Sequence, residues 1–163
     1  MKLSLINKIK LGIIAALAVL ALSLIFSQKA SPDSPLFGLK RLQEKAFMKL
    51  KGSPIDRLNY MSTLLDYRLL ELQAIINTKS FSYMWTTSLR YSTLVGQMTD
   101  LILTNNMGDK KDGIKKQFSE HKKVLNNLYV VYPKNTENIE YKYIEDDINY
   151  LKIYLEKLSN LNK

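Results

Sequence analysis

Apolar residues recur at steps of three and four positions through most of the chain after Pro35. This spacing places them on one side of an α-helix, because an α-helix completes a turn in about 3.6 residues. No segment shows the strict alternation of apolar and polar residues that is typical of a half-buried β-strand. The pattern therefore predicts an all-α domain in which each helix buries one apolar face.

Prolines, glycines and polar runs divide this pattern into about five helices. The expected ranges are Pro35 to about Lys51, Pro54 onwards for about 24 residues, Phe81 to Asn105, Ile114 to Tyr132, and Glu137 to Leu161. The stretch between Asn105 and Ile114 is rich in Asn, Gly and Asp, and it is the clearest predicted loop. Short turns between helices of this length favour an antiparallel bundle.

Each predicted helix has its own expected core face. In the first helix this face consists of Leu36, Leu39, Leu42, Ala46 and Leu50. In the third helix it consists of Met84, Tyr91, Val95, Met98 and Ile102. We expect both sets of side chains to lie in the core of the bundle.

The N-terminal stretch is uncharged and almost entirely apolar from Leu11 to Phe26. As a helix it is roughly 24 Å long, whereas the hydrocarbon core of a membrane is roughly 30 Å thick. This length is borderline between a membrane anchor and a cleaved signal peptide. The small residues that signal peptidase requires are poorly placed near Ser27 and Ala30, so the sequence favours an uncleaved anchor.

Lys2, Lys8 and Lys10 precede the apolar stretch, and the positive-inside rule therefore keeps the N-terminus in the cytoplasm. We expect residues 1–30 to form a single transmembrane or signal helix and residues 31–163 to form one extracytoplasmic domain. The protein would be secreted if the signal were cleaved. Pro32 and Pro35 interrupt the apolar helix, so we expect a hinge between the membrane and the domain.

A proline motif opens the predicted domain, and its members are Pro32, Asp33, Ser34, Pro35, Leu36, Phe37, Leu39 and Lys40. A second short pattern, Arg-Leu-x-Glu, is formed by Arg68, Leu69 and Glu71. Together these patterns resemble a bacterial domain of unknown function that lies just outside a membrane segment. The resemblance implies a helical extracytoplasmic domain of a bacterium, and it implies no established activity.

Residues suited to catalysis or metal binding are sparse. The chain has one histidine and no cysteine, which excludes a thiol nucleophile, a disulfide and a lipid-modified cysteine. His121 lies on the apolar side of its predicted helix, and we interpret it as a partly buried structural residue. Glu145, Asp146 and Asp147 have no glycine-bearing calcium loop around them, so we interpret them as a solvated helix face. We expect neither an enzyme nor a bound cofactor or metal.

Lysines are the strongest sequence evidence for a binding surface, in a chain whose net charge is +9. The candidate residues are Lys110, Lys111, Lys115, Lys116, Lys122 and Lys123. The pairs at 115/116 and 122/123 are seven residues apart, which places them on one helix face, opposite the expected core. This face is either a solvated surface or a site for anionic lipid or cell-wall polymer. Export and the lack of a recognised motif argue against nucleic acid.

These observations favour a membrane-anchored extracytoplasmic helical domain with a structural or interaction role at the bacterial envelope. Its expected partners are the membrane, reached through the N-terminal helix, and an unidentified envelope protein. Two other hypotheses remain open. One is a binding module for anionic lipid or wall polymer that acts through the lysines, and the other is an exported enzyme or regulator of an unrecognised class.

Overall fold

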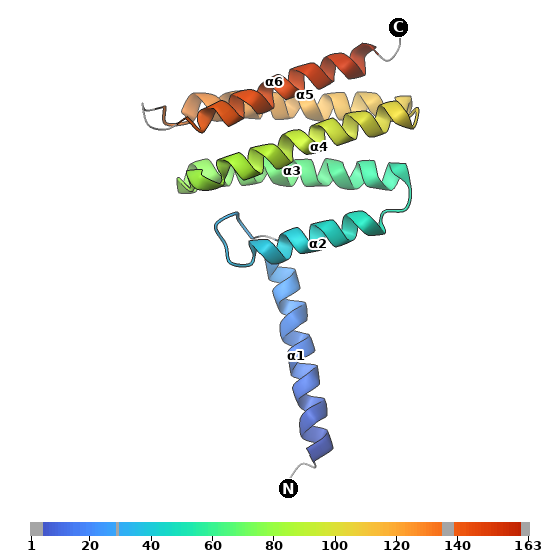
Figure 1. Ribbon diagram of the computed structural model, residues 1–163, viewed down its shortest axis with the longest axis vertical. Helices are drawn as coiled ribbons and strands as arrows, with labels where there is room; N and C mark the ends of the chain where they lie inside the picture. The colour runs from blue at the N-terminus through green and yellow to red at the C-terminus, as the bar shows by residue number, and fades with distance from the viewer. Residues whose placement is uncertain (1–4, 29, 135–138, 161–163) are drawn as a thin grey trace. The chain divides into compact units, whose positions relative to one another are not determined.

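The structure is a computed structural model that describes residues 5–28, 30–134 and 139–160. Within these ranges the chain forms six α-helices, one 3₁₀ turn and no β-strand. The helices are α1 (Leu5–Ser27), α2 (Phe37–Leu50), α3 (Pro54–Thr78), α4 (Met84–Thr104), α5 (Gly108–Val131) and α6 (Tyr141–Ser159), with the 3₁₀ turn η1 (Phe81–Tyr83) before α4 (Figure 1). The all-α prediction is confirmed.

The chain divides into two compact units, Met1–Lys49 and Leu50–Lys163. The first unit contains α1 and α2, and the second contains η1 and the four helices α3 to α6. The sequence predicts a boundary at residue 30 and a bundle that includes the helix after Pro35. In the structure α2 instead groups with α1, so the bundle of the second unit has four helices among the described residues.

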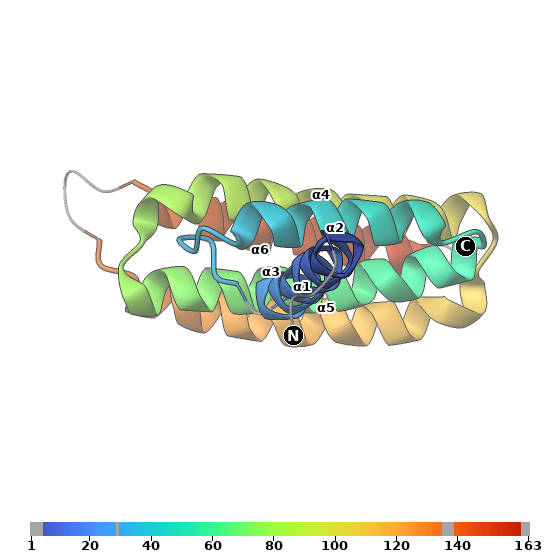
Figure 2. The same cartoon turned by 90° about the horizontal axis from the view of Figure 1, so that it is seen from below.

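The four helices of the second unit run alongside one another (Figures 1 and 2). Helix α3 packs against α4 and α5, and α6 packs against the same two helices, so that the four surround a common core. The most deeply buried apolar side chains of this core are Leu58, Leu65, Leu72, Ile75, Met84, Val95, Met98, Ile102, Phe118, Leu125, Ile144, Leu151 and Leu158. They come from all four helices, as expected for an antiparallel bundle.

Helix α3 begins where the sequence predicts. Ser53 is its N-cap, with an extended backbone and a side-chain oxygen that accepts a hydrogen bond from the Asp56 amide at 3.1 Å. Pro54 occupies the first turn, where its missing N–H is not needed. The helix ends at Lys79, whose φ of 57° lies in the left-handed region, and the Lys79 amide donates to the last turn. The single turn η1 then leads into α4.

Helix α5 begins at Gly108, six residues before the predicted start at Ile114, so the predicted loop is largely helical. The connection shortens to a turn around Asn106, which has a φ of 52°. Met107 is buried beside this turn and its amide donates to the Ile102 carbonyl at 3.0 Å. Asp109 lies in the first turn of α5, where a negative charge is favourable. Burial of Met107 and this charge outweigh the helix-breaking tendency of two glycines.

Helix α2 begins at Phe37, after a tight turn in which the Ser34 hydroxyl accepts from the Leu36 amide at 3.3 Å. Its predicted core face is wrong, because Leu42, Ala46 and Leu50 are exposed. The buried side chains of α2 are instead two charged ones, Lys40 and Glu44. Lys40 donates to the Ala30 carbonyl, and Glu44 pairs with Arg41 of the same helix.

Two side chains of α2 bind the C-terminal end of α1. The Gln43 amide nitrogen donates to the Leu24 carbonyl at 3.0 Å, and the Ser27 hydroxyl lies 3.1 Å from the Gln43 amide oxygen. The Lys40 ammonium group donates to the Ala30 carbonyl at 3.2 Å. These donors satisfy acceptors that a helix end leaves without a partner in the helix. The proline segment predicted to be a hinge is therefore bridged by hydrogen bonds.

Helix α1 exposes apolar side chains on all its sides. The exposed ones are Ile13, Ile14, Leu17, Val19, Leu20, Leu22, Ile25 and Phe26. Searched across the described part of the chain, no helix is both long enough and apolar enough to cross a membrane. A helix that is apolar all round has no polar face to present to water.

Candidate functional site

The predicted lysine surface lies along α5. Lys116 and Lys123 are exposed, while Lys115 and Lys122 are half-buried on the same side of the helix. None of these four lysines forms an ion pair with any residue in the described ranges.

The other two candidate lysines differ from these four. Lys110 pairs with its neighbour Asp109, with Nζ and Oδ2 3.0 Å apart, and this hydrogen bond lowers the pKa of the exposed Asp109 carboxyl. Lys111 is buried, unlike the four lysines of the seven-residue repeat. It lies at the start of α5, within the stretch that was predicted to be a loop. The lysine surface consequently reduces to Lys115, Lys116, Lys122 and Lys123.

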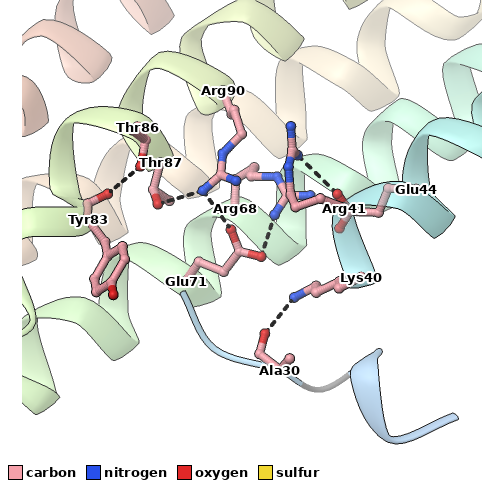
Figure 3. Close-up of polar contacts among 10 residues, drawn as sticks. All are labelled: Ala30, Lys40, Arg41, Glu44, Arg68, Glu71, Tyr83, Thr86, Thr87 and Arg90. Atoms are coloured by element: carbon pink, nitrogen blue, oxygen red, sulfur yellow. Dashed lines mark hydrogen bonds and ion pairs between the residues drawn. The ribbon is translucent and has the colours of Figure 1, made fainter. Parts of the chain in front are cut away.

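The Arg-Leu-x-Glu pattern forms a buried ionic cluster between α3 and α4. Arg68 donates to one carboxylate oxygen of Glu71, and the other oxygen of Glu71 lies 3.8 Å from the Arg90 guanidinium of α4 (Figure 3). Arg90 also donates to the Thr87 hydroxyl at 2.9 Å. Breaking a buried ion pair by removing one partner is costly, so this cluster fixes how α3 and α4 meet.

Figure 3 also shows charged residues of α2 that belong to the first unit. Lys40 reaches the Ala30 carbonyl, and Arg41 pairs with Glu44 at 3.1 Å. Lys40 is the last residue of the proline motif, so the structure gives this motif a structural role. It closes the turn between the two helices of the first unit.

A second polar cluster lies inside the four-helix unit and was not predicted as a unit. The Tyr91 hydroxyl of α4 lies 3.1 Å from Nδ1 of His121 on α5, and Nε2 of the same ring lies 2.9 Å from Oδ1 of Asp66 on α3. The Gln117 amide nitrogen also donates to this Asp66 oxygen at 2.7 Å and to the Ser62 carbonyl at 3.1 Å. We call the three residues Tyr91, His121 and Asp66 the polar chain.

Burial of the polar chain increases from Asp66 to Tyr91. The Asp66 side chain is 54% exposed, the His121 side chain is 7% exposed, and Tyr91 is completely buried. The predicted burial of His121 is confirmed. A hydroxyl, an imidazole and a carboxylate that are hydrogen-bonded one to the next resemble the arrangement used in nucleophilic catalysis. A substrate cannot reach this hydroxyl, however, because Tyr91 is completely buried. Burial also raises the pKa of Tyr91, and the charges of Asp147 and Asp66 raise it further.

Asp147 of α6 corrects the interpretation of the acidic run as a solvated face. Glu145 and Asp146 are exposed as expected, but Asp147 is completely buried. Both of its carboxylate oxygens are buried without a hydrogen-bond partner in the described part of the chain. Burial raises the pKa of this carboxyl well above its usual range, and the charge of Asp146 raises it further. The neighbouring Ser88 hydroxyl acts in the opposite direction, although its hydrogen goes to the Tyr143 carbonyl at 3.1 Å.

Metal ligands do not converge anywhere in the described ranges, where no group of three or more His, Asp or Glu side chains could hold an ion. Asp66 and His121 supply two neighbouring ligands, and the third residue of the polar chain is a tyrosine. A structural or catalytic metal site needs at least three protein ligands in reach of one another. The polar chain is thus a hydrogen-bonded unit of the core.

Comparison with known proteins gives one match. The model of a family described as a domain of unknown function (DUF5667) matches residues 29–135. This range begins just before the proline motif, contains α2, α3 and α4, and extends beyond the end of α5. No curated protein and no solved structure matches the chain.

Proposed function

Because the chain belongs to this family, which has no assigned activity, we propose a function from its own residues: a membrane-anchored helical domain outside the cytoplasm, with a structural or interaction role at the bacterial envelope. The observation that carries the proposal is the apolar, exposed surface of α1. An apolar helix of this kind is stable in a membrane or in a protein core. Among the described residues, Gln43 of α2 forms hydrogen bonds with Leu24 and Ser27 at the C-terminal end of α1.

The length of α1 sets a condition on the proposal. The described part of the helix falls short of a full crossing. An anchor is therefore consistent only if Lys10 extends its long side chain to the headgroups, or if the bilayer thins locally around the helix. The lysines before the apolar stretch would then lie in the cytoplasm, and both α2 and the four-helix unit would lie on the opposite side.

The anchor is tested by introducing charged residues into α1 and measuring membrane association in bacterial cells. In one variant Leu17→Arg and Leu20→Arg place two charges within the helix, and in the matched control Val130→Arg and Val131→Arg place them on the exposed surface of α5. We expect the wild type and the control to sediment with membranes after alkaline washing, and the α1 variant to be released. Mass spectrometry should find the N-terminal segment retained. A mature N-terminus between residues 27 and 34, or membrane association of all three proteins, would contradict the anchor.

The lysine surface supports a second candidate function, the binding of anionic lipid or wall polymer. Lys115, Lys116, Lys122 and Lys123 project from one side of α5 and have no acidic partner in the described ranges. Each lysine near an anionic membrane contributes about 1 kcal/mol of binding free energy. Four such contributions are enough for measurable association at low salt. This surface does not require a cavity, and a polymer or a bilayer could contact it along its length.

Vesicle and polymer sedimentation test this second candidate. The four lysines are changed to Gln, and a matched control carries Lys45→Gln, Lys49→Gln, Lys142→Gln and Lys152→Gln, which remove the same charge from dispersed exposed positions. We expect the α5 variant to bind anionic vesicles or wall polymer more weakly than the control, and the difference to fade with salt. Equal binding of the two variants would show that total charge, rather than this surface, is responsible.

We propose no catalytic role. The proposal is supported by the polar chain, whose only hydroxyl has no access to solvent. An activity screen of the purified chain with hydrolase and transferase substrates tests it, and turnover that is lost in Tyr91→Phe or His121→Gln would overturn it.

A further inference from the structure

All four helices of the second unit contribute a titratable group to the region around Tyr91. Asp66 comes from α3, Tyr91 from α4, His121 from α5 and Asp147 from α6. The charges of both Asp66 and Asp147 raise the pKa of the Tyr91 hydroxyl. Neither membrane anchoring nor the lysine surface uses these residues.

The hydrogen positions in the polar chain follow from what each group can donate. An ionised Asp66 carboxylate only accepts, so the hydrogen of the neutral imidazole must be on Nε2. The Nδ1 atom then has a free lone pair and accepts the hydrogen of the Tyr91 hydroxyl at 3.1 Å. Gln117 donates to Asp66 from the same side and supports this arrangement. The neutral imidazole therefore satisfies both neighbours at once.

A second proton on His121 disrupts this arrangement. The proton binds Nδ1, which then donates to the Tyr91 oxygen across the same 3.1 Å, so the Tyr91 hydroxyl hydrogen loses its acceptor. This hydrogen then needs another acceptor, although Tyr91 is completely buried and His121 is the hydrogen-bond partner of its hydroxyl among the described residues. An unsatisfied buried donor is unfavourable, so protonation weakens the contact between α4 and α5.

We propose that the polar chain is an acid-sensitive latch, which holds α4 and α3 to α5 while His121 is neutral and releases them when His121 is protonated. The ordinary pKa of histidine is about 6.5. Burial lowers the pKa of His121 below this value in the closed bundle. The open or unfolded bundle consequently takes up the proton first as the pH falls. The stability that the latch contributes is complete above about pH 6.5 and is lost progressively below it.

Charged groups on three elements influence the latch. Asp66 of α3 and Glu120 of α5 raise the pKa of His121 and so oppose the effect of burial. The charge of Asp147 of α6 raises the pKa of the Tyr91 hydroxyl. Burial is the largest of these influences on His121. The latch should therefore weaken as the pH falls below the ordinary pKa of histidine.

The single histidine of the chain allows a direct test by NMR. The full chain, prepared without a histidine tag in detergent micelles, gives one set of imidazole signals. We expect the Nε2–H tautomer near neutral pH and a titration midpoint below about 6.5. The Nδ1–H tautomer, or a midpoint at or above the ordinary value, would overturn the proposal.

Two variants with a matched control complete the test. Asp66→Asn removes the charge that stabilises the imidazolium and should shift the midpoint to lower pH, whereas Asp100→Asn on the exposed side of α4 should leave it unchanged. We also expect the melting temperature of the wild type to fall by several degrees between about pH 7.5 and about pH 5.5, and that of His121→Phe to fall less. If His121→Phe does not fold, the midpoint shift in Asp66→Asn decides by itself. Equal acid losses in wild type and His121→Phe, or equal midpoints in the two Asp variants, would refute the latch.

Discussion

Helices α2 and α4 both have apolar residues at helical spacing, but only α4 buries them. Met84, Tyr91, Val95, Met98 and Ile102 of α4 are all completely buried. In α2 the corresponding positions Leu42, Ala46 and Leu50 are exposed, and Lys40 and Glu44 are buried in their place. Helix α4 packs against other amphipathic helices, whereas α2 meets the carbonyl oxygens at the end of α1. An apolar stripe therefore predicts burial only where the neighbouring surface is also apolar.

The largest effect is expected from truncating one leucine in each region. Leu65 of α3 is completely buried, and Leu65→Ala should lower the free energy of unfolding by about 2–5 kcal/mol through lost packing and a cavity. Leu42 of α2 is 65% exposed, and Leu42→Ala should change it by no more than about 0.5 kcal/mol. Urea unfolding of the full chain in micelles measures both. A large loss in Leu42→Ala would show that α2 does bury its apolar stripe.

Asp147 provides the next largest effect, and the size of this effect depends on pH. The pKa of Asp147 is raised in the folded state. Below about pH 4 the carboxyl is protonated in both the folded and the unfolded protein. Above this pH it ionises more readily in the unfolded protein, which lowers the free energy of unfolding. Asp147→Asn removes this difference. We expect a higher melting temperature than wild type, by several degrees, at neutral pH, and a gain that disappears near pH 4.

Asp146→Asn is the matched control for this comparison, because Asp146 adjoins Asp147 in α6 and is exposed. It should change the melting temperature little at either pH. The same gain in Asp147→Asn at both pH values would argue that improved packing, rather than removal of a buried carboxyl, is responsible.

Substitution of two glutamines should have smaller effects on stability, and each substitution should affect only one of the two units. Gln117 joins α5 to Ser62 and Asp66 of α3, and Gln117→Ala should cost about 1–2 kcal/mol of unfolding free energy in the second unit. Gln43 binds the end of α1, and Gln43→Ala should leave that unfolding transition unchanged. Hydrogen exchange of the Gln28 amide should instead become faster, because the last turn of α1 loses its capping contact. Protection of this amide equal to wild type would disprove the capping role.

The smallest effect is expected at Gly96, where α4 approaches α6 closely. A Cβ atom at this position would lie 2.9 Å from the Tyr154 hydroxyl oxygen, which is the far end of a flexible side chain. Gly96→Ala gains about 1 kcal/mol of helix propensity and displaces that hydroxyl, so the two effects nearly cancel. Gly96→Leu has no such freedom and should destabilise the bundle. Thermal unfolding of both variants measures this contrast, and equal melting temperatures would show that the close approach is not required.

Much of the second unit could be predicted from local sequence. Ser53 and Pro54 mark the start of α3 by a chemistry that depends only on neighbouring residues. The core positions of α6, from Ile144 to Leu158, follow the helical period because apolar neighbours surround them. The burial of His121 followed from the same reasoning, since it lies at an apolar position of α5.

The remaining features depend on contacts between distant residues. The early start of α5 depends on burial of Met107, whose surroundings local composition does not reveal. The chain from Tyr91 to Asp66 joins residues of three helices, and no spacing within a single helix predicts it. Asp147 belongs to a run of three acidic residues, a pattern that is typical of a solvated helix face. Its burial becomes evident only when α6 is packed against α4.

The hydrogen bonds between α1 and α2 have a mechanical consequence. Gln43 is bonded to Leu24 and Ser27 in the last turn of α1, and Lys40 to Ala30 just beyond it. These hydrogen bonds connect the two helices in addition to the segment between Ala30 and Ser34. Without them, that segment alone would connect α1 to α2. If α1 rotates about its axis or shifts along it, the hydrogen bonds of Gln43 and Lys40 would transmit this motion to α2, in addition to the proline segment. A force on α1 would therefore act on the side chains of Gln43 and Lys40, which form these hydrogen bonds.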